Sequence, residues 1–492
     1  MKITFSNLGS IKKTTLDLRP LTVIIGPNNS NKTYIAYSIY GLLNGIAITA
    51  MAPLVFGLGY KVGDGNLSND IQKIYQIDSN GSYLLKIDDF LRILLEDTSQ
   101  LTQNFEQNLK EFFQDTSGKL FKKTKFEIKL SLEELRDAFN KLVSSKDFAN
   151  SEKITYTLDE NLFLAKIKED FDYFEKVPLQ HFVASSILFE LKSFLYPQAF
   201  LLPAERNALI ISYKILENRR YELLKNANRN RFVQQNLTQK YQRNLFETLK
   251  DVPFQEDVRY LQPSINYPQP IEDFLRFLTN LELENPLEKG NFAEFAEDIE
   301  KNLQKGDKTN YISREVGGRE IKINIEKDLD IDLYNASSSI KQLAPLLLYL
   351  RYRAKENDLL IIDEPEMNLH PESQAKFLEI LGMLVNAGIN VLLTTHSPYF
   401  MSHLNNLVSG KTDDEKTLKE QAKSLYLKDE RAFLSMDDVS AYEMKNNKLK
   451  DLKDKDYGIR WDTLSDVSAD IQQKYFEIYE KSKETSDGEE EN

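Results

Sequence analysis

The first fifty residues alternate short apolar runs with polar turns. Residues 2–8 alternate in polarity like a strand with one buried face, residues 9–13 form a turn, and residues 14–20 pair back onto the first strand. Residues 21–25 (LTVII) are apolar and β-branched, which is typical of a strand buried on both faces. The pattern therefore predicts three strands, a loop over residues 26–33 and then a helix.

A second block of strands and helices begins near residue 330. Helical spacing over residues 340–356 precedes an apolar strand at 359–363, and helical spacing over 371–388 precedes another at 390–395. The two strand–helix halves are thus separated by more than half of the chain. They form either two domains or one sheet interrupted by a long insertion.

The stretch between the halves, residues 62–329, has mainly the pattern of amphipathic helices. Apolar residues recur at three- and four-residue spacing in 99–115 and 131–145, and alternation at 125–131 and 153–169 predicts strands. No heptad pattern continues far enough for an extended coiled coil, and we find no internal repeat.

The C-terminal region, about 425–480, predicts further strands and a final helix. The strands are expected at 424–436 and 440–447. The last residues, 484–492, form an acidic stretch without apolar side chains, which we expect to be disordered.

Residues 33–60 carry no charged side chain and are long enough to be a candidate membrane span. Asn44, Pro53 and several glycines weaken that interpretation. The run also begins inside the loop at residues 26–33, which must be accessible to water. We interpret it as a buried helix followed by an apolar hairpin or interface, and we expect no membrane partner. The N-terminus lacks the apolar run and cleavage site of a signal peptide, which predicts a cytoplasmic protein.

Composition narrows the classes of function. The chain has 492 residues and 41% are hydrophobic, so disorder of the whole chain is excluded, and two to four lobes are expected at roughly 100–200 residues per domain. The absence of cysteine excludes disulfides, thiolate zinc sites, iron–sulfur clusters and a cysteine nucleophile. A formal net charge of −13 argues against a protein that coats nucleic acid, although a local basic strip is compatible with it.

Residues 26–33 (GPNNSNKT) fit the pattern G-x-x-x-x-G-K-[ST], except that Asn31 replaces the second glycine. In such a loop, backbone N–H groups and a helix N-terminus hold an anion, while Lys32 reaches the β- and γ-phosphates and Thr33 binds Mg²⁺. Asparagine tolerates the left-handed backbone that we expect at position 31. The alternative is a chance turn, which the flanking strand and helix disfavour. The candidate nucleotide-binding residues are Gly26, Pro27, Asn28, Asn29, Ser30, Asn31, Lys32 and Thr33.

Two apolar strands of the second block end in ionisable residues, carboxylates in one case and a histidine in the other. Asp363 and Glu364 close the strand at 359–363, at the edge where ligands bind in α/β folds. We expect Asp363 to bind Mg²⁺, together with Thr33, and Glu364 to orient or deprotonate the attacking water. His396 ends the next strand and would reach the γ-phosphate side. A solvent-exposed strand end and a structural histidine are the respective alternatives.

The three motifs resemble the Walker A, Walker B and switch-histidine motifs of ABC-type ATPases of the SMC, RecF and OLD (overcoming-lysogenization-defect) branch. Residues 363–374 (DEPEMNLHPESQ) and 394–400 (TTHSPYF) closely resemble stand-alone ATPases of OLD-like bacterial antiphage systems, including PARIS, Septu and retron loci. The similarity covers about residues 1–60 and 330–460, together with residues 201–207 (LLPAERN).

The resemblance implies an α/β P-loop fold of the ABC-ATPase head type, with an antiparallel β subdomain and a long insertion. The first half of the head, with Walker A, is expected at 1–61, and a mainly helical insertion or lid with some strands at 62–329. The second half, with the signature, Walker B and the switch histidine, is expected at 330–480. A disordered acidic tail is expected at 481–492.

The resemblance also implies a signature loop before the helix that leads to the Walker B strand. Ser337, Ser338 and Ser339 occupy that place, with Ser339 where relatives have glycine, and an ordinary serine N-cap is an equally good interpretation. Such a loop completes the site of a second copy, which implies a homodimer or higher oligomer with ATP between two heads. Residues 368–370 would cross that interface.

Four further residues are weaker candidates for contacts with the nucleotide or its metal ion. Gln198 and Glu205 are candidates for the Mg²⁺-contacting loop of the resembled ATPases, and Lys12 and Lys13 for nucleotide contacts. Two lysines in a turn are more often simply solvated.

A basic segment lies within 207–250, where the pattern is again helical. Its cations are Arg219, Arg220, Lys225, Arg229, Arg231, Lys240 and Arg243. This helix is the best candidate for binding nucleic acid or a partner, and a solvated face is the simpler alternative. Just before it, Arg206 is expected to hold a phosphate or a carboxylate.

Two functional classes remain at the level of sequence. In one, the chain is an ATP- and Mg²⁺-dependent sensor or scaffold that controls a separately encoded nuclease or toxin, with a phage protein or nucleic acid as the trigger. In the other, it is itself an OLD-like nuclease or an SMC/RecF-like DNA-repair ATPase. We favour the first class, because Asp437, Asp438 and residues 450–456 offer acidic side chains without the buried strand and glutamate of a nuclease module.

Overall fold

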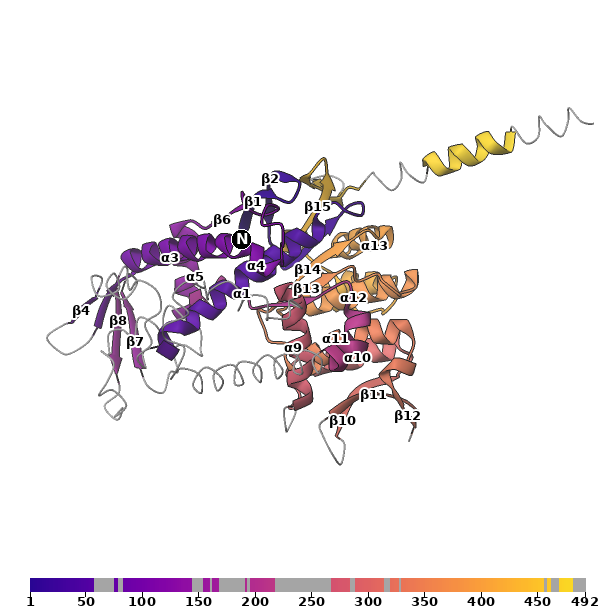
Figure 1. Cartoon of the computed structure of the whole chain (residues 1–492), viewed down its shortest axis with the longest axis horizontal. Helices are drawn as coiled ribbons and strands as arrows, with labels where there is room; N and C mark the ends of the chain where they lie inside the picture. The colour runs from indigo at the N-terminus through magenta and orange to yellow at the C-terminus, as the bar shows by residue number, and fades with distance from the viewer. Residues whose placement is uncertain are drawn as a thin grey trace, which may run out of the picture.

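The computed structural model of the chain is drawn in Figure 1. It describes residues 1–56, 75–77, 83–143, 154–159, 162–167, 191–192, 195–216, 267–283, 288–313, 319–326, 329–454, 458–461 and 469–480. The basic residues of 217–250 and the acidic tail of 481–492 lie outside these ranges, so the expectations for them stay predictions.

A six-stranded sheet at the centre joins the two halves of the sequence. Its strand order is β16-β15-β3-β14-β13-β9, with five neighbouring parallel strands and β16 antiparallel at one edge. The strands are β3 (Leu21–Ile25), β9 (Ala199–Leu202), β13 (Leu359–Asp363), β14 (Asn390–Thr395), β15 (Val439–Lys445) and β16 (Lys448–Asp451). Of the two arrangements left open by the sequence, the chain therefore adopts the single interrupted sheet.

A smaller antiparallel sheet lies beside the first. It has the order β2-β1-β6, formed by β1 (Lys2–Leu8), β2 (Ile11–Asp17) and β6 (Lys125–Lys129). The first two strands were expected from their alternation. The middle stretch contributes β6 to this sheet and β9 to the central one, so it is more than a lid inserted between two halves.

Helices cover both faces of the central sheet (Figure 1). Helix α1 (Lys32–Phe56) packs on one face, together with the antiparallel sheet. The other face carries α9 (Gln269–Leu283), α10 (Ala293–Leu303), α11 (Ser338–Tyr352), α12 (Pro371–Asn386) and α13 (Pro398–Ser409).

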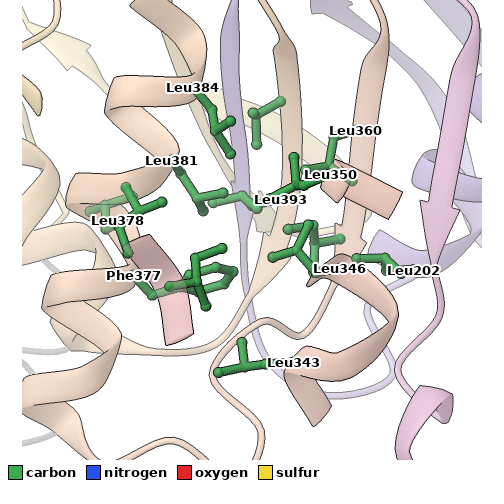
Figure 2. Packing of buried hydrophobic residues seen from close by; sticks show 14 of the residues in the cluster. Leu202, Leu343, Leu346, Leu350, Leu360, Phe377, Leu378, Leu381, Leu384 and Leu393 are labelled. Carbon is green, nitrogen blue, oxygen red and sulfur yellow. The ribbon is translucent and has the colours of Figure 1, made fainter. Parts of the chain in front are cut away.

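Burial on both faces explains why the central strands are almost wholly apolar. Figure 2 shows Leu360 and Leu393 of the strands packed among Leu346 and Leu350 of α11 and Leu381 of α12, with all five side chains buried. Each such leucine contributes roughly 1.5–3 kcal/mol to folding. This core fixes the strands whose ends carry the candidate site.

The remaining elements lie around this head. A four-stranded sheet has the order β4 (Tyr75–Ile77), β5 (Tyr83–Lys86), β8 (Leu162–Ile167) and β7 (Ile154–Asp159), and a three-stranded sheet has the order β10 (Lys308–Ser313), β11 (Arg319–Glu326) and β12 (Leu329–Asp332). The helices are α3 (Ile87–Gln107), α4 (Leu109–Phe112), α5 (Leu132–Val143) and α14 (Glu415–Ala422). The smaller elements are the hairpin of β17 (Lys453–Asp454) and β18 (Gly458–Ile459) and the 3₁₀ turns η2 (Leu333–Asn335), η3 (Glu430–Ala432) and η4 (Met436–Asp438). Residues 469–480 form a helix that projects away from the head (Figure 1).

The helix expected in the uncharged run is α1, which continues through Pro53 to Phe56. The apolar hairpin or interface expected after it falls on residues outside the described ranges and stays a prediction. One expectation about local structure is wrong. Residues 424–436 form turns and η3 instead of a strand, because their carbonyls bind α12: Asn386 Nδ2 donates to the oxygens of Arg431 and Phe433 at 2.8 and 2.9 Å. Among the described residues, no helix combines the length and apolarity that crossing a membrane requires.

Candidate nucleotide site

The register of the central sheet brings the predicted motifs to one edge. Ile25 of β3 lies beside Thr395 of β14, and Asp363 of β13 lies beside Thr394. Because these strands are parallel, the loop after β3, the carboxylates after β13 and His396 after β14 emerge together.

The loop over residues 26–33 has the left-handed backbone that was expected at position 31, and a second one at Asn29 that was not expected. Asn31 adopts φ +68° and Asn29 adopts φ +60°, both left-handed. The side chain of Asn31 also donates to Ser10 Oγ at 2.6 Å, and Ser10 Oγ donates to Asn447 at 2.9 Å. A Cβ at Gly9 would lie 2.8 Å from Asn31 Oδ1. The asparagine is therefore tied to the β1–β2 turn, a contact that glycine at position 31 would lack.

Lys32 starts α1 and is buried beneath the loop. Its Nζ donates to the carbonyls of Gly26 and Pro27, each at 2.9 Å. Burial lowers the pKa of Lys32, while the charges of Glu364 and Asp363 act in the opposite direction. Ser30 Oγ is also buried and has no hydrogen-bond partner. The loop thus offers a cation and a free hydroxyl to an anion.

A hollow of about 270 Å³ opens between the loop and the ends of the second block. It is lined by Asn28, Asn29, Ser30, Asn31, Lys32, Thr33, Tyr34, Glu364 and His396. Sequence reasoning did not single out Tyr34, although it directly follows Thr33. Its ring packs edge-on against Phe113 and Phe121, with centroids 5.5 and 5.4 Å away.

Thr33 and Asp363 form an oxygen pair suited to a hard cation. Thr33 Oγ1 lies 3.5 Å from Asp363 Oδ1, and the hydroxyl of Thr394 donates to the same oxygen. Burial raises the pKa of Asp363 to about 6, so a nearby cation would favour its ionised form. These donors fit Mg²⁺, which prefers carboxylate and hydroxyl oxygens.

Glu364 and His396 face the hollow from neighbouring strand ends. Glu364 adopts φ +50°, and its amide donates to the carbonyl of Thr394 at 3.0 Å. His396 Nδ1 lies 3.6 Å from Glu364 Oε1 and 3.5 Å from Glu366 Oε1. The geometry thus brings together the two residues that we expected to be catalytic.

Glu366 is a member of the site that sequence reasoning missed. It is buried, and its Oε1 accepts from Thr395 Oγ1 and the amide of His396, both at 2.8 Å. Its Oε2 has no hydrogen-bond partner. The sequence signal that could have identified Glu366 was its position as a second carboxylate two residues after Glu364. In the fold, Glu366 holds the loop that carries His396.

Arg206 differs from its expected role. We expected a phosphate or carboxylate partner, but the buried guanidinium donates to carbonyl oxygens, including those of Asp363 at 2.7 Å and Glu364 at 3.1 Å. Burial lowers the pKa of Arg206 to about 10, and the neighbouring carboxylates oppose that shift. The side chain therefore stays charged at neutral pH.

Other candidates lie outside the hollow. Gln198, Glu205, Lys12 and Lys13 are exposed and do not line it. Ser337, Ser338 and Ser339 lie at the start of α11, where Ser337 Oγ accepts from the amide of Ile340 at 3.4 Å as an N-cap. Asn368 and His370 are exposed in the turn before α12. Within one chain, the serines and this turn do not join the hollow.

The sheet order and the loop at its edge define an α/β P-loop ATPase head of the ABC type. The chain matches the model of the AAA ATPase domain over residues 1–401. Since this match covers most of its length, the chain belongs to that family, whose members are ATPases.

Three known proteins show further similarity. The Old nuclease of Escherichia phage P2 is 37% identical over 79 residues, so the match covers 15% of this chain and 14% of that relative. A crystal structure of the Smc head domain with an extended coiled coil, bound to the C-terminal domain of ScpA and derived from Pyrococcus furiosus, has 12% identity over 96% of this chain and 98% of that one, with a TM-score of 0.31. An Smc head bound to the C-winged helix domain of ScpA has 11% identity, coverage of 92% and 95%, and a TM-score of 0.33.

Proposed function

We propose that this chain binds ATP with Mg²⁺ at the hollow and hydrolyses it to ADP and phosphate. The observation that carries the proposal is the meeting of Lys32 and Thr33 with Asp363, Glu364 and His396 at one sheet edge, although more than 300 residues separate the two groups. The N–H groups at the start of α1 and the Lys32 ammonium hold the phosphates.

Each of the remaining residues has one role in this proposal. Thr33 and Asp363 hold Mg²⁺, which, when bound, neutralises charge on the phosphates. Glu364 accepts a proton from the attacking water, and His396, held against it by Glu366, donates a hydrogen bond on the γ-phosphate side.

We further propose that two heads pair around ATP. Ser337 and Ser338 are exposed at the start of α11, outside the hollow of their own chain, which leaves them available to the site of a second copy. The exposed Asn368 and His370 would cross the interface. The resemblance to OLD-like antiphage ATPases then supports a cytoplasmic sensor that controls a separately encoded nuclease or toxin.

A substitution of Glu364 tests the enzymatic part. Glu364→Gln is expected to lower ATP turnover roughly 10²–10⁴-fold, because it removes the general base, while ATP binding is retained. The matched control is Glu372→Gln, an exposed glutamate that pairs with Lys376 on α12. Turnover would be measured as phosphate release, and paired heads as an ATP-dependent doubling of mass. Undiminished turnover in the Glu364 variant would exclude the assigned role.

The partial similarity to the Old nuclease favours one second candidate, a DNA-processing enzyme. Incubating the purified chain alone with plasmid or transfer RNA, in Mg²⁺ or Mn²⁺, separates the two proposals. We expect no cleavage. Robust cleavage that the Glu364 variant retains would support the second candidate.

A further inference from the structure

The strained backbone at the end of β13 is held by one side chain from a distant part of the sequence. Arg206 Nη1 donates to the carbonyl oxygens of Asp363 at 2.7 Å and Pro203 at 2.9 Å, and its Nη2 donates to that of Glu364 at 3.1 Å. One guanidinium thus binds the carbonyls of Asp363, the last residue of β13, and of Glu364, the next residue, and Arg206 is only 2% exposed.

This clamp acts at a residue whose backbone conformation is unfavourable. Glu364 has φ +50°, a left-handed conformation that costs a residue with a side chain roughly 1–2 kcal/mol. Such a residue keeps its conformation only when its surroundings determine it. The planar guanidinium has its donors in a fixed geometry, so it fixes the direction in which the Glu364 carboxylate leaves the chain.

The same guanidinium contacts helix α11. Its Nε donates to the backbone oxygen of Gln342 at 3.2 Å. With its amide oxygen turned toward the arginine, the buried Gln342 side chain also accepts from Nη2 at 2.6 Å and from Nε at 3.2 Å. Gln342 lies one turn after the serines that begin α11, and Asn207 Nδ2 donates to the carbonyl of Ser338 at 3.4 Å.

We propose that Arg206 is a positioning residue that links the first turns of α11 to the backbone of Asp363 and Glu364. Docking of a second copy at residues 337–339 thereby sets the orientation of the Glu364 carboxylate. This inference rests on the proposed pairing of two heads around ATP.

A second buried arginine, Arg351, lies on α11 and supplies a matched control. Arg351 Nη2 lies 2.8 Å from Glu300 Oε1, and its Nη1 donates to the carbonyl of Thr309, away from the hollow. Arg206→Lys and Arg351→Lys both keep the charge and remove the planar fork. They differ in whether the contact reaches Glu364.

Two measurements on the full chain test the link. Hydrogen exchange of the nucleotide-free protein measures the amide of Glu364, which donates to Thr394 of β14, and the amides of Met367 and Leu369, which donate to Glu364 and Glu366 within the turn after β13. We expect Arg206→Lys to speed their exchange and to lower turnover about 10- to 100-fold, because small displacements of a catalytic group have effects of that size. The affinity for ATP should fall by a smaller factor than turnover, since Lys32 and the loop at 26–33 still hold the phosphates, whereas Arg206 reaches the proposed Mg²⁺ ligand Asp363 only through its carbonyl. Arg351→Lys should change neither quantity when values are compared per folded molecule.

The link with α11 has its own test. Gln342→Leu should lower turnover, and combining it with Arg206→Lys should add little further loss, because both substitutions break the same chain of contacts. Equal behaviour of Arg206→Lys and Arg351→Lys, or fully additive effects of Arg206→Lys and Gln342→Leu, would overturn the proposal. If the wild-type chain shows no ATP turnover, the proposed function fails; unchanged exchange in Arg206→Lys would then still reject the clamp.

Discussion

At the scale of single residues, the site combines strain with desolvation. Asn31 and Glu364 both hold left-handed backbones, and both are fixed by side chains from elsewhere: Asn31 by Ser10, and Glu364 by Arg206. Lys32 and Asp363 are both buried. Burial lowers the pKa of Lys32 and raises that of Asp363, and both shifts favour the neutral form of the side chain. A polar, preformed pocket of this kind is stabilised when charged ligands enter it.

Asp363→Asn is expected to make the nucleotide-free protein more stable at neutral pH. The pKa of Asp363 is raised from 3.8 to about 6, so its contribution to stability is full below pH 4 and is lost as pH rises through 6. Removing the charge should therefore raise the unfolding free energy by about 1–3 kcal/mol at pH 8 and by less at pH 4.

Denaturant unfolding at both pH values measures this difference. The exposed Asp413→Asn variant is the control and should change neither value. A loss of stability at pH 8 in Asp363→Asn would show that its hydrogen bonds with Thr394 and Thr33 outweigh the cost of burying its charge.

At the scale of elements, leucines between the sheet and its helices hold the strands in place. Leu393 of β14 is fully buried in this core (Figure 2). Leu393→Ala should lower the unfolding free energy by about 2–5 kcal/mol, because it leaves a cavity that close-packed neighbours cannot fill. Leu120, which is 44% exposed, gives the matched substitution Leu120→Ala, expected to change stability by about 0.5 kcal/mol or less. Thermal and denaturant unfolding compare the two.

How well an element was predicted depends on how local its signal is. Strands β3, β13 and β14 were expected because burial on both faces makes them continuous apolar runs, and the phosphate loop follows directly from its strand. The pairing of β9 with β13 was not expected, because the sequence of an apolar strand does not indicate which strand will lie beside it. Residues 424–436 alternate like a strand, but hydrogen bonds to Asn386 decide their conformation. Glu366 and Arg206 act through contacts that only the fold creates.

At the scale of the whole molecule, the helix at 469–480 differs from the other helices that the structure describes. All of its residues are exposed, including Ile471, Tyr475 and Ile478, and it projects away from the head (Figure 1). Ending the chain at residue 468 should therefore leave the midpoint of thermal unfolding unchanged, because the helix contributes little burial to the head. Calorimetry of the two chains checks this expectation. A clear drop in the midpoint would mean that the helix packs on the head in solution.

The central place of β3 has a consequence for how the chain is made. This strand leaves the ribosome while its sheet neighbours β14 and β15 are still unmade. At 5–20 residues per second, synthesis of the intervening stretch takes roughly 20–70 s. During that time β3 lacks the two strands that flank it in the folded sheet. Chaperones that shield β3 after it emerges should therefore increase the yield of active protein.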